Sequence, residues 1–211
     1  MKKVILLAAI ACLLIMGLAI GDEEKTFDTN TVYFENVTAK PGESFAVKVN
    51  IANVDTLSGM QVPIFFRSDK IKLQCDSVSF TGSRCEYFMF NDIKIPMVCE
   101  KCKAEYDKVN APPKKAGICD KCGGKLVHNG QVVYFSLIDN VDPKLTVDPL
   151  YPGDGLVATI YFTAPKDCPK GTVKLTRGMI PHPTISYIYT VWNPLGTELD
   201  CVFKEGEIKI K

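Results

Sequence analysis

The chain has 211 residues, of which 46% are hydrophobic and 23% are charged, with 25 basic residues against 24 acidic ones. This length suffices for one well-packed domain with a small insert, and the apolar content is that of a chain that folds by itself. The balanced charge and the lack of a lysine or arginine run argue against a nucleic-acid-binding protein, which needs a basic surface.

The first 21 residues have the composition of a signal peptide. Lys2 and Lys3 precede an apolar run over 4–20, and small residues follow that suit cleavage. We therefore expect a signal peptide over 1–21 and a secreted, cell-surface or periplasmic protein. Two alternatives stay open. One is an uncleaved membrane anchor, since the run is at the short limit for a spanning helix, and the other is lipidation at Cys12.

Short runs of alternating or fully apolar residues follow the leader, separated by Gly, Pro, Asn and Asp. Such runs predict β-strands, most clearly in SFAVKVNIANV, where Val47, Val49 and Ile51 point to one face. The expected strands cover 31–36, 44–54, 59–66, 71–80, 87–95, 131–139, 155–164, 172–176, 185–192 and 201–211. A series of this kind is typical of an antiparallel sandwich or jelly roll, so we expect residues 22–211 to form one all-β sandwich.

Residues 97–128 differ from the rest because they are rich in lysine and cysteine, and we interpret them as an insert between the strands expected at 87–95 and 131–139. Two C-x-x-C pairs in the insert have the spacing of a tetrahedral four-cysteine zinc site. The expected zinc ligands are Cys99, Cys102, Cys119 and Cys122. Four cysteines leave no position for water, which predicts a structural zinc. Two disulfides are the alternative, although C-x-x-C rarely closes without strain.

Four cysteines outside the insert and the leader are candidates for disulfides. They are Cys75, Cys85, Cys168 and Cys201. An even number in an exported chain suggests bridges, and four cysteines allow three pairings. We favour Cys75–Cys85 and Cys168–Cys201, because a sandwich could bring each pair of segments together.

Three stretches resemble cohesin domains. Residues 37–66 contain the pattern V-x-x-K-P-G before an alternating strand, residues 153–176 contain G-D-G-x-x-A-T-I-x-F, and residues 197–211 place a Gly before an alternating end. Cohesins are nine-stranded jelly-roll sandwiches that bind dockerins, which are small calcium-loaded helical modules fused to extracellular enzymes or scaffolds. The resemblance implies an exported, non-catalytic module that captures dockerin-bearing partners in polysaccharide-degrading assemblies. A carbohydrate-binding module of the same fold group is the alternative.

The resemblance also implies where a partner binds. Cohesins use the sheet face formed by their third, fifth, sixth and eighth strands, and the insert lies between the fifth and the sixth. The expected strand 131–139 is apolar on both faces, so its outer face is either covered by the insert or offered to a partner. The expected partner-binding residues are Gln61, Pro63, Phe65, Val133, Phe135 and Leu137. Where the family has an aromatic residue followed by Asp, this chain has Phe66-Arg67, which leaves the dockerin type open.

The insert itself resembles the zinc-bearing lid of adenylate kinases. The matching residues are Tyr106, Pro112, Pro113, Lys114, Gly117 and Asp120, and Asp107 replaces the family's His. The chain contains no G-x-x-x-x-G-K-[ST] loop for phosphates. The resemblance therefore concerns a fold element and implies no kinase activity.

The sequence offers no catalytic motif, and two weaker patterns each have a plainer alternative. Asp139, Asp142, Asp148 and Asp154 are either calcium ligands or ordinary turn residues. Tyr187, Tyr189 and Trp192 form either a sugar-stacking platform, which would suit a polysaccharide partner, or part of the packing.

Overall fold

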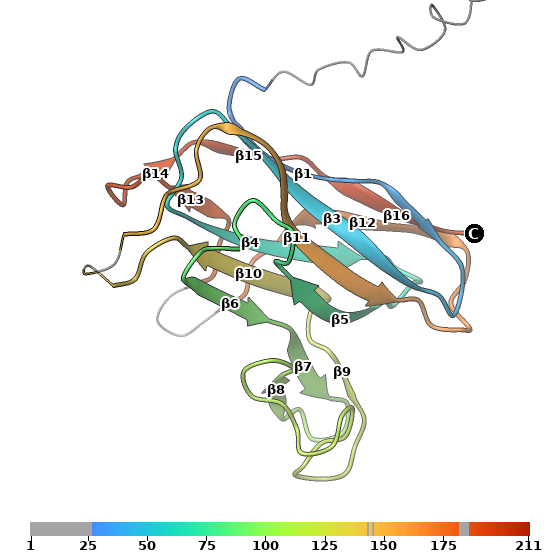
Figure 1. Cartoon of the computed structure of the whole chain (residues 1–211). Helices are drawn as coiled ribbons and strands as arrows, with labels where there is room; N and C mark the ends of the chain where they lie inside the picture. Colours follow the sequence, from blue (N-terminus) through green and yellow to red (C-terminus); the bar gives the residue numbers. More distant parts are fainter. Residues whose placement is uncertain (1–26, 143, 145, 182–185) are drawn as a thin grey trace, which may run out of the picture.

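Two β-sheets face each other across an apolar core, and a small three-stranded sheet projects from them (Figure 1). The computed structural model describes residues 27–142, 144, 146–181 and 186–211, so the expected signal peptide lies outside the described residues. The strands are β1 (Asn30–Phe34), β2 (Val37–Ala39), β3 (Ser44–Asn53), β4 (Gly59–Arg67), β5 (Gln74–Ser79), β6 (Phe90–Lys94), β7 (Pro96–Cys99), β8 (Glu105–Asp107), β9 (Leu126–His128), β10 (Val132–Ile138), β11 (Gly153–Thr163), β12 (Gly171–Arg177), β13 (Thr190–Trp192), β14 (Glu198–Leu199), β15 (Cys201–Phe203) and β16 (Gly206–Ile210). The described part of the chain contains no helix long and apolar enough to cross a membrane.

The expected all-β sandwich is confirmed. The first sheet has the strand order β15-β1-β3-β11-β5, and the second has β14-β13-β4-β12-β16-β2, with β10 beside β4 and β6 beside β10. The two sheets have five and eight strands, more than the nine expected. The run 201–211 splits into β15 and β16, and the short strands β2 and β14 lie outside the expected runs. Both β12 and β13 pair with β4, so the chain leaves this sheet after Arg177 and returns at Thr190.

Alternation along the strands builds the core. Val47, Val49 and Ile51 of β3 are fully buried, as their spacing predicts. On β4 the inward positions include Phe66, whose ring meets that of Phe162 from β11 edge-on, with ring centroids 5.1 Å apart. This aromatic pair joins the two sheets directly.

Strand β10 has the opposite parity from the one expected. Val133, Phe135 and Leu137 were expected to face a partner, but they are at most 1% exposed and belong to the core. The register explains this, because Val133 lies opposite Ile64 and Phe135 opposite Val62. Directly paired residues of antiparallel strands share a face, and that face of β4 is the inward one. The expectation is therefore corrected, and these three residues are core residues.

The expected disulfide between Cys75 and Cys85 does not form, since both are free and buried thiols. Cys75 lies opposite Phe162 on β11, whereas the backbone N–H of Arg84 donates to the carbonyl of Leu156. Six residues of strand separate these points, which is about 20 Å, and a disulfide requires Cα atoms less than about 7 Å apart. Burial raises the pKa of each thiol to about 12, so both stay protonated.

The second expected disulfide is excluded in the same way, and Cys168 and Cys201 are also free. Cys168 follows the end of β11, where Thr163 pairs with Ser44 at the first residue of β3. Cys201 pairs with Asn30, beside the last residues of β3. The ten residues of β3 separate these ends of the sandwich by about 30 Å.

The Gly-Asp-Gly motif has a structural role. Arg84 passes over Gly153 and Gly155, and a Cβ atom at these positions would lie 2.8 and 3.0 Å from its side chain. The guanidinium donates to the carbonyls of Tyr151 and Ile51. The glycines therefore make room for an arginine that ties the loop before β11 to β3.

The corrected parity of β10 predicts a contrast between two phenylalanines. Replacing Phe135 by Ala should lower the free energy of unfolding by about 3–5 kcal/mol, because the change leaves a cavity in the core. Replacing Phe90 on the neighbouring strand, which is 40% exposed, should change it by less than about 1 kcal/mol. Urea unfolding of both variants measures the difference, and equal effects would contradict the register of β10 on β4.

Candidate metal centre and partner face

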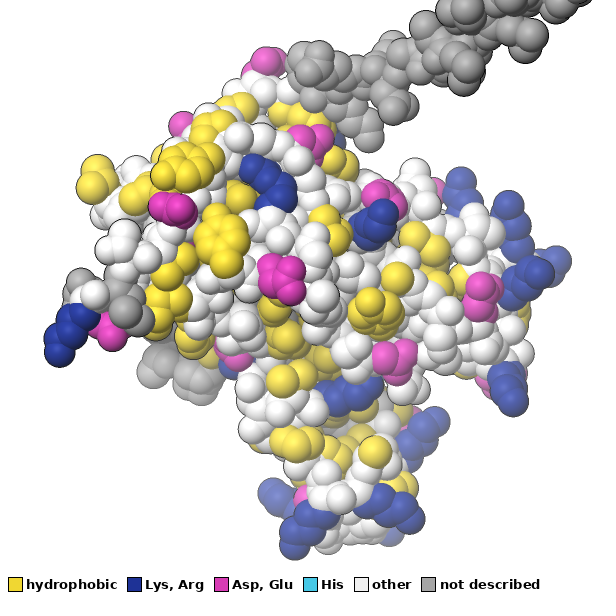
Figure 2. Space-filling model, viewed as in Figure 1, with side chains coloured by type: hydrophobic (Ala, Val, Ile, Leu, Met, Phe, Trp, Pro, Cys, Tyr) yellow, Lys and Arg dark blue, Asp and Glu magenta, His cyan; other side chains and the backbone are white. Residues whose placement is uncertain are grey.

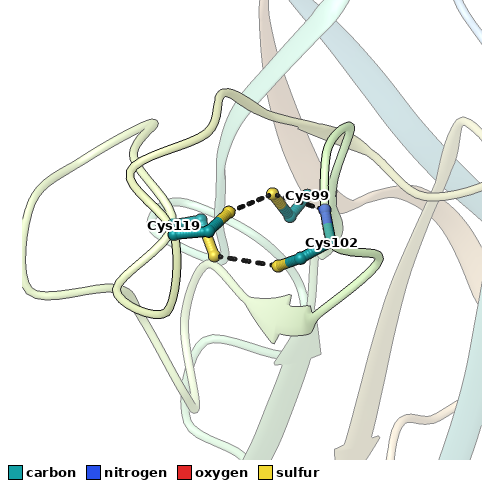
Figure 3. A group of neighbouring side chains, drawn as sticks. Cys99, Cys102 and Cys119 are labelled. Atoms are coloured by element: carbon teal, nitrogen blue, oxygen red, sulfur yellow. Dashed lines mark hydrogen bonds between the residues drawn. The ribbon is translucent and has the colours of Figure 1, made fainter.

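Four cysteine sulfurs meet at the end of the ribbon, the three-stranded sheet formed by residues 97–128. The Sγ atoms of Cys99, Cys102, Cys119 and Cys122 all lie within 4.8 Å of one another, and Figure 3 shows the three labelled side chains converging. The Sγ pairs Cys99–Cys122 and Cys102–Cys119 are each 3.5 Å apart. A tetrahedral metal with bonds of about 2.3 Å needs sulfurs about 3.8 Å apart. The cluster therefore fits a metal, and the cysteines are free thiols and not disulfides.

The two C-x-x-C pairs form matching turns. The backbone N–H of Lys103 donates to the carbonyl of Cys99, and that of Gly123 donates to the carbonyl of Cys119. Lys103 and Gly123 have φ angles of 58° and 68°, the left-handed conformation that suits glycine. At Gly124 a Cβ atom would lie 2.9 Å from the Sγ of Cys99. The backbone thus forms two turns that place the sulfurs together, and no side chain fits beside them at position 124.

Tyr106 supports the cluster from the side. Its hydroxyl lies 3.5 Å from the Sγ of Cys119 and accepts a hydrogen bond from the backbone N–H of Asp120 at 2.9 Å. The hydroxyl hydrogen bond lowers the pKa of the Cys119 thiol to about 6, which favours the thiolate that binds metals. All four donors are soft sulfurs, so the geometry suits a closed, structural metal site.

The ribbon has almost no core of its own. Its buried cluster consists of Cys99, Cys119 and Leu126, and exposed lysines surround its far end (Figure 2). A segment with so little buried apolar surface needs another source of stability, and metal binding is the usual one in small domains.

Polar contacts fix the ribbon to the sandwich. The backbone N–H of Cys75 on β5 donates to Nε2 of His128 at 2.9 Å. Lys108 donates to the carbonyl of Cys75 at 3.0 Å and lies 3.6 Å from the carboxylate of Asp76. Asn110 donates to the carbonyl of Ile93 on β6 at 2.8 Å. The ribbon is therefore held at two strands. No sequence pattern indicates this role for His128 or Lys108, because both contacts join distant segments.

The outer face of the second sheet carries the other expected partner residues. Gln61 and Phe65 are half-buried on β4, and Pro63 between them is buried. On β10 the outward residues are Val132, Tyr134, Ser136 and Ile138, and the first three are at most 4% exposed. Something must therefore cover the middle of this face.

The cover is the excursion between β12 and β13, which we call the crossing segment (residues 178–181 and 186–189). The N–H of Gly178 donates to the carbonyl of Pro63, and Ile180 and Tyr187 exchange two backbone hydrogen bonds. The ring of Tyr187 lies 4.9 Å from that of Tyr134, and the ammonium of Lys94 lies 5.0 Å from the same Tyr187 ring. The chain thus covers β4 and β10 with its own residues and reaches β6.

The structure favours the plainer alternative for both weaker sequence patterns, which is packing for the aromatic residues and turn formation for the aspartates. Tyr189 is buried and donates its hydroxyl hydrogen to the carbonyl of Val202, while Tyr187 packs on Tyr134, so no aromatic platform is exposed there. Asp142 accepts a hydrogen bond from the backbone N–H of Lys144, as a turn residue does. Among the described residues, the four cysteines are the one group whose atoms could hold a metal.

Two kinds of known protein resemble this chain, namely adenylate kinases in sequence and cohesins in structure. Residues 97–128 match the family described as "Adenylate kinase, active site lid". An adenylate kinase from Geobacillus sp. is 55% identical over 29 residues, 14% of this chain and 13% of that protein. One from Lactobacillus johnsonii is 29% identical over 119 residues, 50% of this chain and 51% of that protein. The chain thus spans about half or less of the curated relatives it matches, and the family match is confined to the ribbon.

Several solved structures that resemble the chain are cohesins. A cohesin in a type I cohesin–dockerin complex from Clostridium thermocellum has a TM-score of 0.57 at 14% identity, over 87% of this chain and 100% of that one. A second such complex from that organism gives 0.55 at 17% identity, over 90% and 98%. A non-cellulosomal cohesin from Archaeoglobus fulgidus gives 0.52 at 14% identity, over 87% and 92%. At these identities the likeness establishes the fold, which is cohesin-like.

The contact between His128 of the ribbon and Cys75 of β5 predicts that the stability of the protein depends on pH. Burial, assisted by Lys108, lowers the pKa of His128 from 6.5 to about 4. The unfolded chain therefore binds more protons than the folded chain between these values, so stability should fall as the pH falls from about 6.5 to about 4. The loss should be about 3 kcal/mol. Replacing His128 by Gln, which does not titrate, should remove this part of the pH profile in urea unfolding, and an unchanged profile would contradict it.

Proposed function

We propose that this protein is an exported, non-catalytic module that binds a dockerin-type partner. The observation that carries the proposal is the cohesin-like sandwich, which covers the full length of a cohesin solved with its dockerin. The partner surface would be the outer face of β12, β4, β10 and β6 together with the crossing segment. Export is supported by the signal-peptide character of residues 1–21, and a role in polysaccharide-degrading assemblies follows from the resemblance to cohesins.

Apolar side chains on this surface support the proposal. Met179 and Ile188 of the crossing segment are 45% and 42% exposed, and Phe90 of β6 is 40% exposed. Phe90 has the same parity as Lys94 and therefore lies on the outer face. Exposed apolar side chains that gather on one face are typical of a protein-binding surface. The crossing segment covers the strands expected to bind and itself offers a surface in their place.

We further propose that the ribbon holds one structural zinc ion. Four thiolates would bind it, and its role would be to order a segment without a core. No position remains for water or substrate, so the metal would take no part in catalysis. The match of residues 97–128 to the adenylate kinase lid concerns this fold element, and the chain lacks the phosphate loop that a kinase of this type needs.

The carbohydrate-binding alternative has less support from the surface than a protein partner has. It depends on an exposed platform of Tyr187, Tyr189 and Trp192, but Tyr189 is 2% exposed, and Tyr187 and Trp192 are half-buried against Tyr134 and Gly59. A protein partner is therefore the function that the surface supports best.

Dockerin binding can be tested by calorimetry against a panel of calcium-loaded dockerin modules. We expect at least one module to bind, and the double variant Met179→Asp and Ile188→Asp should weaken binding at least tenfold, because two charges would be buried in the interface. The matched control is Tyr161→Asp on β11, which is 42% exposed on the other sheet and should change binding less than twofold. Failure of every module to bind the wild type would refute the proposal.

Metal analysis tests the zinc site. Purified wild type should contain one zinc ion per chain, and Cys99→Ser combined with Cys119→Ser should contain none, because two ligands do not retain the ion. Cys168→Ser, which removes a thiol outside the ribbon, is the control and should keep the full content. A wild type without zinc, whose ribbon cysteines are oxidised in a peptide map, would rule the site out.

A further inference from the structure

A cavity lies where the outer face, the ribbon and the crossing segment meet. Its volume is about 490 Å³, and three different elements supply its walls. Phe65 and Val132 come from the sheet, Met97 from the ribbon, and Met179 and Ile180 from the crossing segment. The lining is therefore mostly apolar, with a polarizable thioether on two sides, while Asn129 and two charged residues add polar groups. Methionine side chains adapt to varied apolar groups, so the cavity suits a large aliphatic or aromatic side chain.

Two charges of opposite sign stand at the rim. Arg67 comes from β4 and Glu105 from the ribbon, and both are exposed. The guanidinium of Arg67 lies 3.3 Å from the centre of the Phe65 ring, and its Nε–H donates to the carbonyl of Gly130 at 3.1 Å. Among the described residues neither charge forms an ion pair. The remaining guanidinium hydrogens and the Glu105 carboxylate are available to charged groups of a partner.

The ribbon wall is held in place before any partner arrives. Asn110 and His128 fix the ribbon to β6 and β5, and the hydroxyl of Tyr106, another lining residue, is held by the N–H of Asp120. A wall fixed in this way loses little conformational entropy when a ligand enters, which favours affinity. The connection between β6 and β10 thus adds a fixed, shaped element to the proposed partner surface.

We propose that this cavity is the subsite that receives one large apolar side chain from a helix of the dockerin-type partner, flanked by an acidic and a basic residue. The inference rests on the proposed function, and it assigns the ribbon the role of selecting the partner. The acidic residue would pair with Arg67 and the basic one with Glu105. A helix laid across a groove presents side chains in this way, and a desolvated pocket with an apolar anchor is where binding energy concentrates.

The test uses the full mature chain and the dockerin module that binds the wild type in the calorimetric panel. Val132→Phe extends a ring into the cavity, and Glu105→Arg reverses the rim charge on the ribbon. Each should weaken binding at least tenfold. The matched control is Glu100→Arg, which makes the same charge change on the ribbon beside a different hollow and should change binding less than twofold. Zinc content and thermal midpoint establish that each variant is folded. If Val132→Phe does not fold, Glu105→Arg decides the test, because Glu105 is exposed and its replacement leaves the core intact.

The outcomes separate the two proposals. If no dockerin binds the wild type, the proposed function fails and this inference fails with it. If a dockerin binds and both folded variants bind as tightly as the wild type, the inference alone is overturned. A concentration-dependent dimer of the wild type that Val132→Phe abolishes in light scattering would assign the cavity to a second copy and would also overturn it.

Discussion

Strand β10 is apolar on both faces, and the shape of the proposed partner surface depends on the need to bury both. Its inward residues pair with the inward residues of β4 and complete the core. Its outward residues, Val132 and Tyr134, cannot be left in water without cost, and the crossing segment packs its Tyr187 ring on Tyr134. The outer face of this sheet, which we propose as the partner surface, is thus partly covered by the chain itself.

The position of the ribbon also depends on strand β10. It occupies the connection between β6 and β10, which pair as antiparallel neighbours, so the inserted residues emerge at the edge of the outer face. Its sulfur cluster replaces a core, and its contacts through Asn110, Lys108 and His128 fix its direction. A module that resembles a kinase lid in sequence therefore acts as a wall in a different setting, where no phosphate loop accompanies it.

The cavity between the outer face, the ribbon and the crossing segment has charged residues at its rim. Arg67 stands where the cohesin pattern has an acidic residue, and it lies flat on Phe65. The neighbouring Glu105 comes from the ribbon, which matches the adenylate kinase lid. Charged groups of this kind at the rim of a binding surface favour partners of complementary charge.

The sequence by itself determined the features that depend on local pattern. Alternation identified the sandwich and the inward residues of β3 and β4, and cysteine spacing identified the four cysteines that cluster as a candidate metal site, because both signals arise within one strand or one turn. Only the tertiary structure decided which face of β10 points to the core, since a strand that is apolar on both faces has the same sequence pattern in either case. Three further features depend on contacts between distant residues, which no local pattern specifies. They are the contact between His128 and Cys75, the crossing segment, and the separation of the free thiols Cys75, Cys85, Cys168 and Cys201.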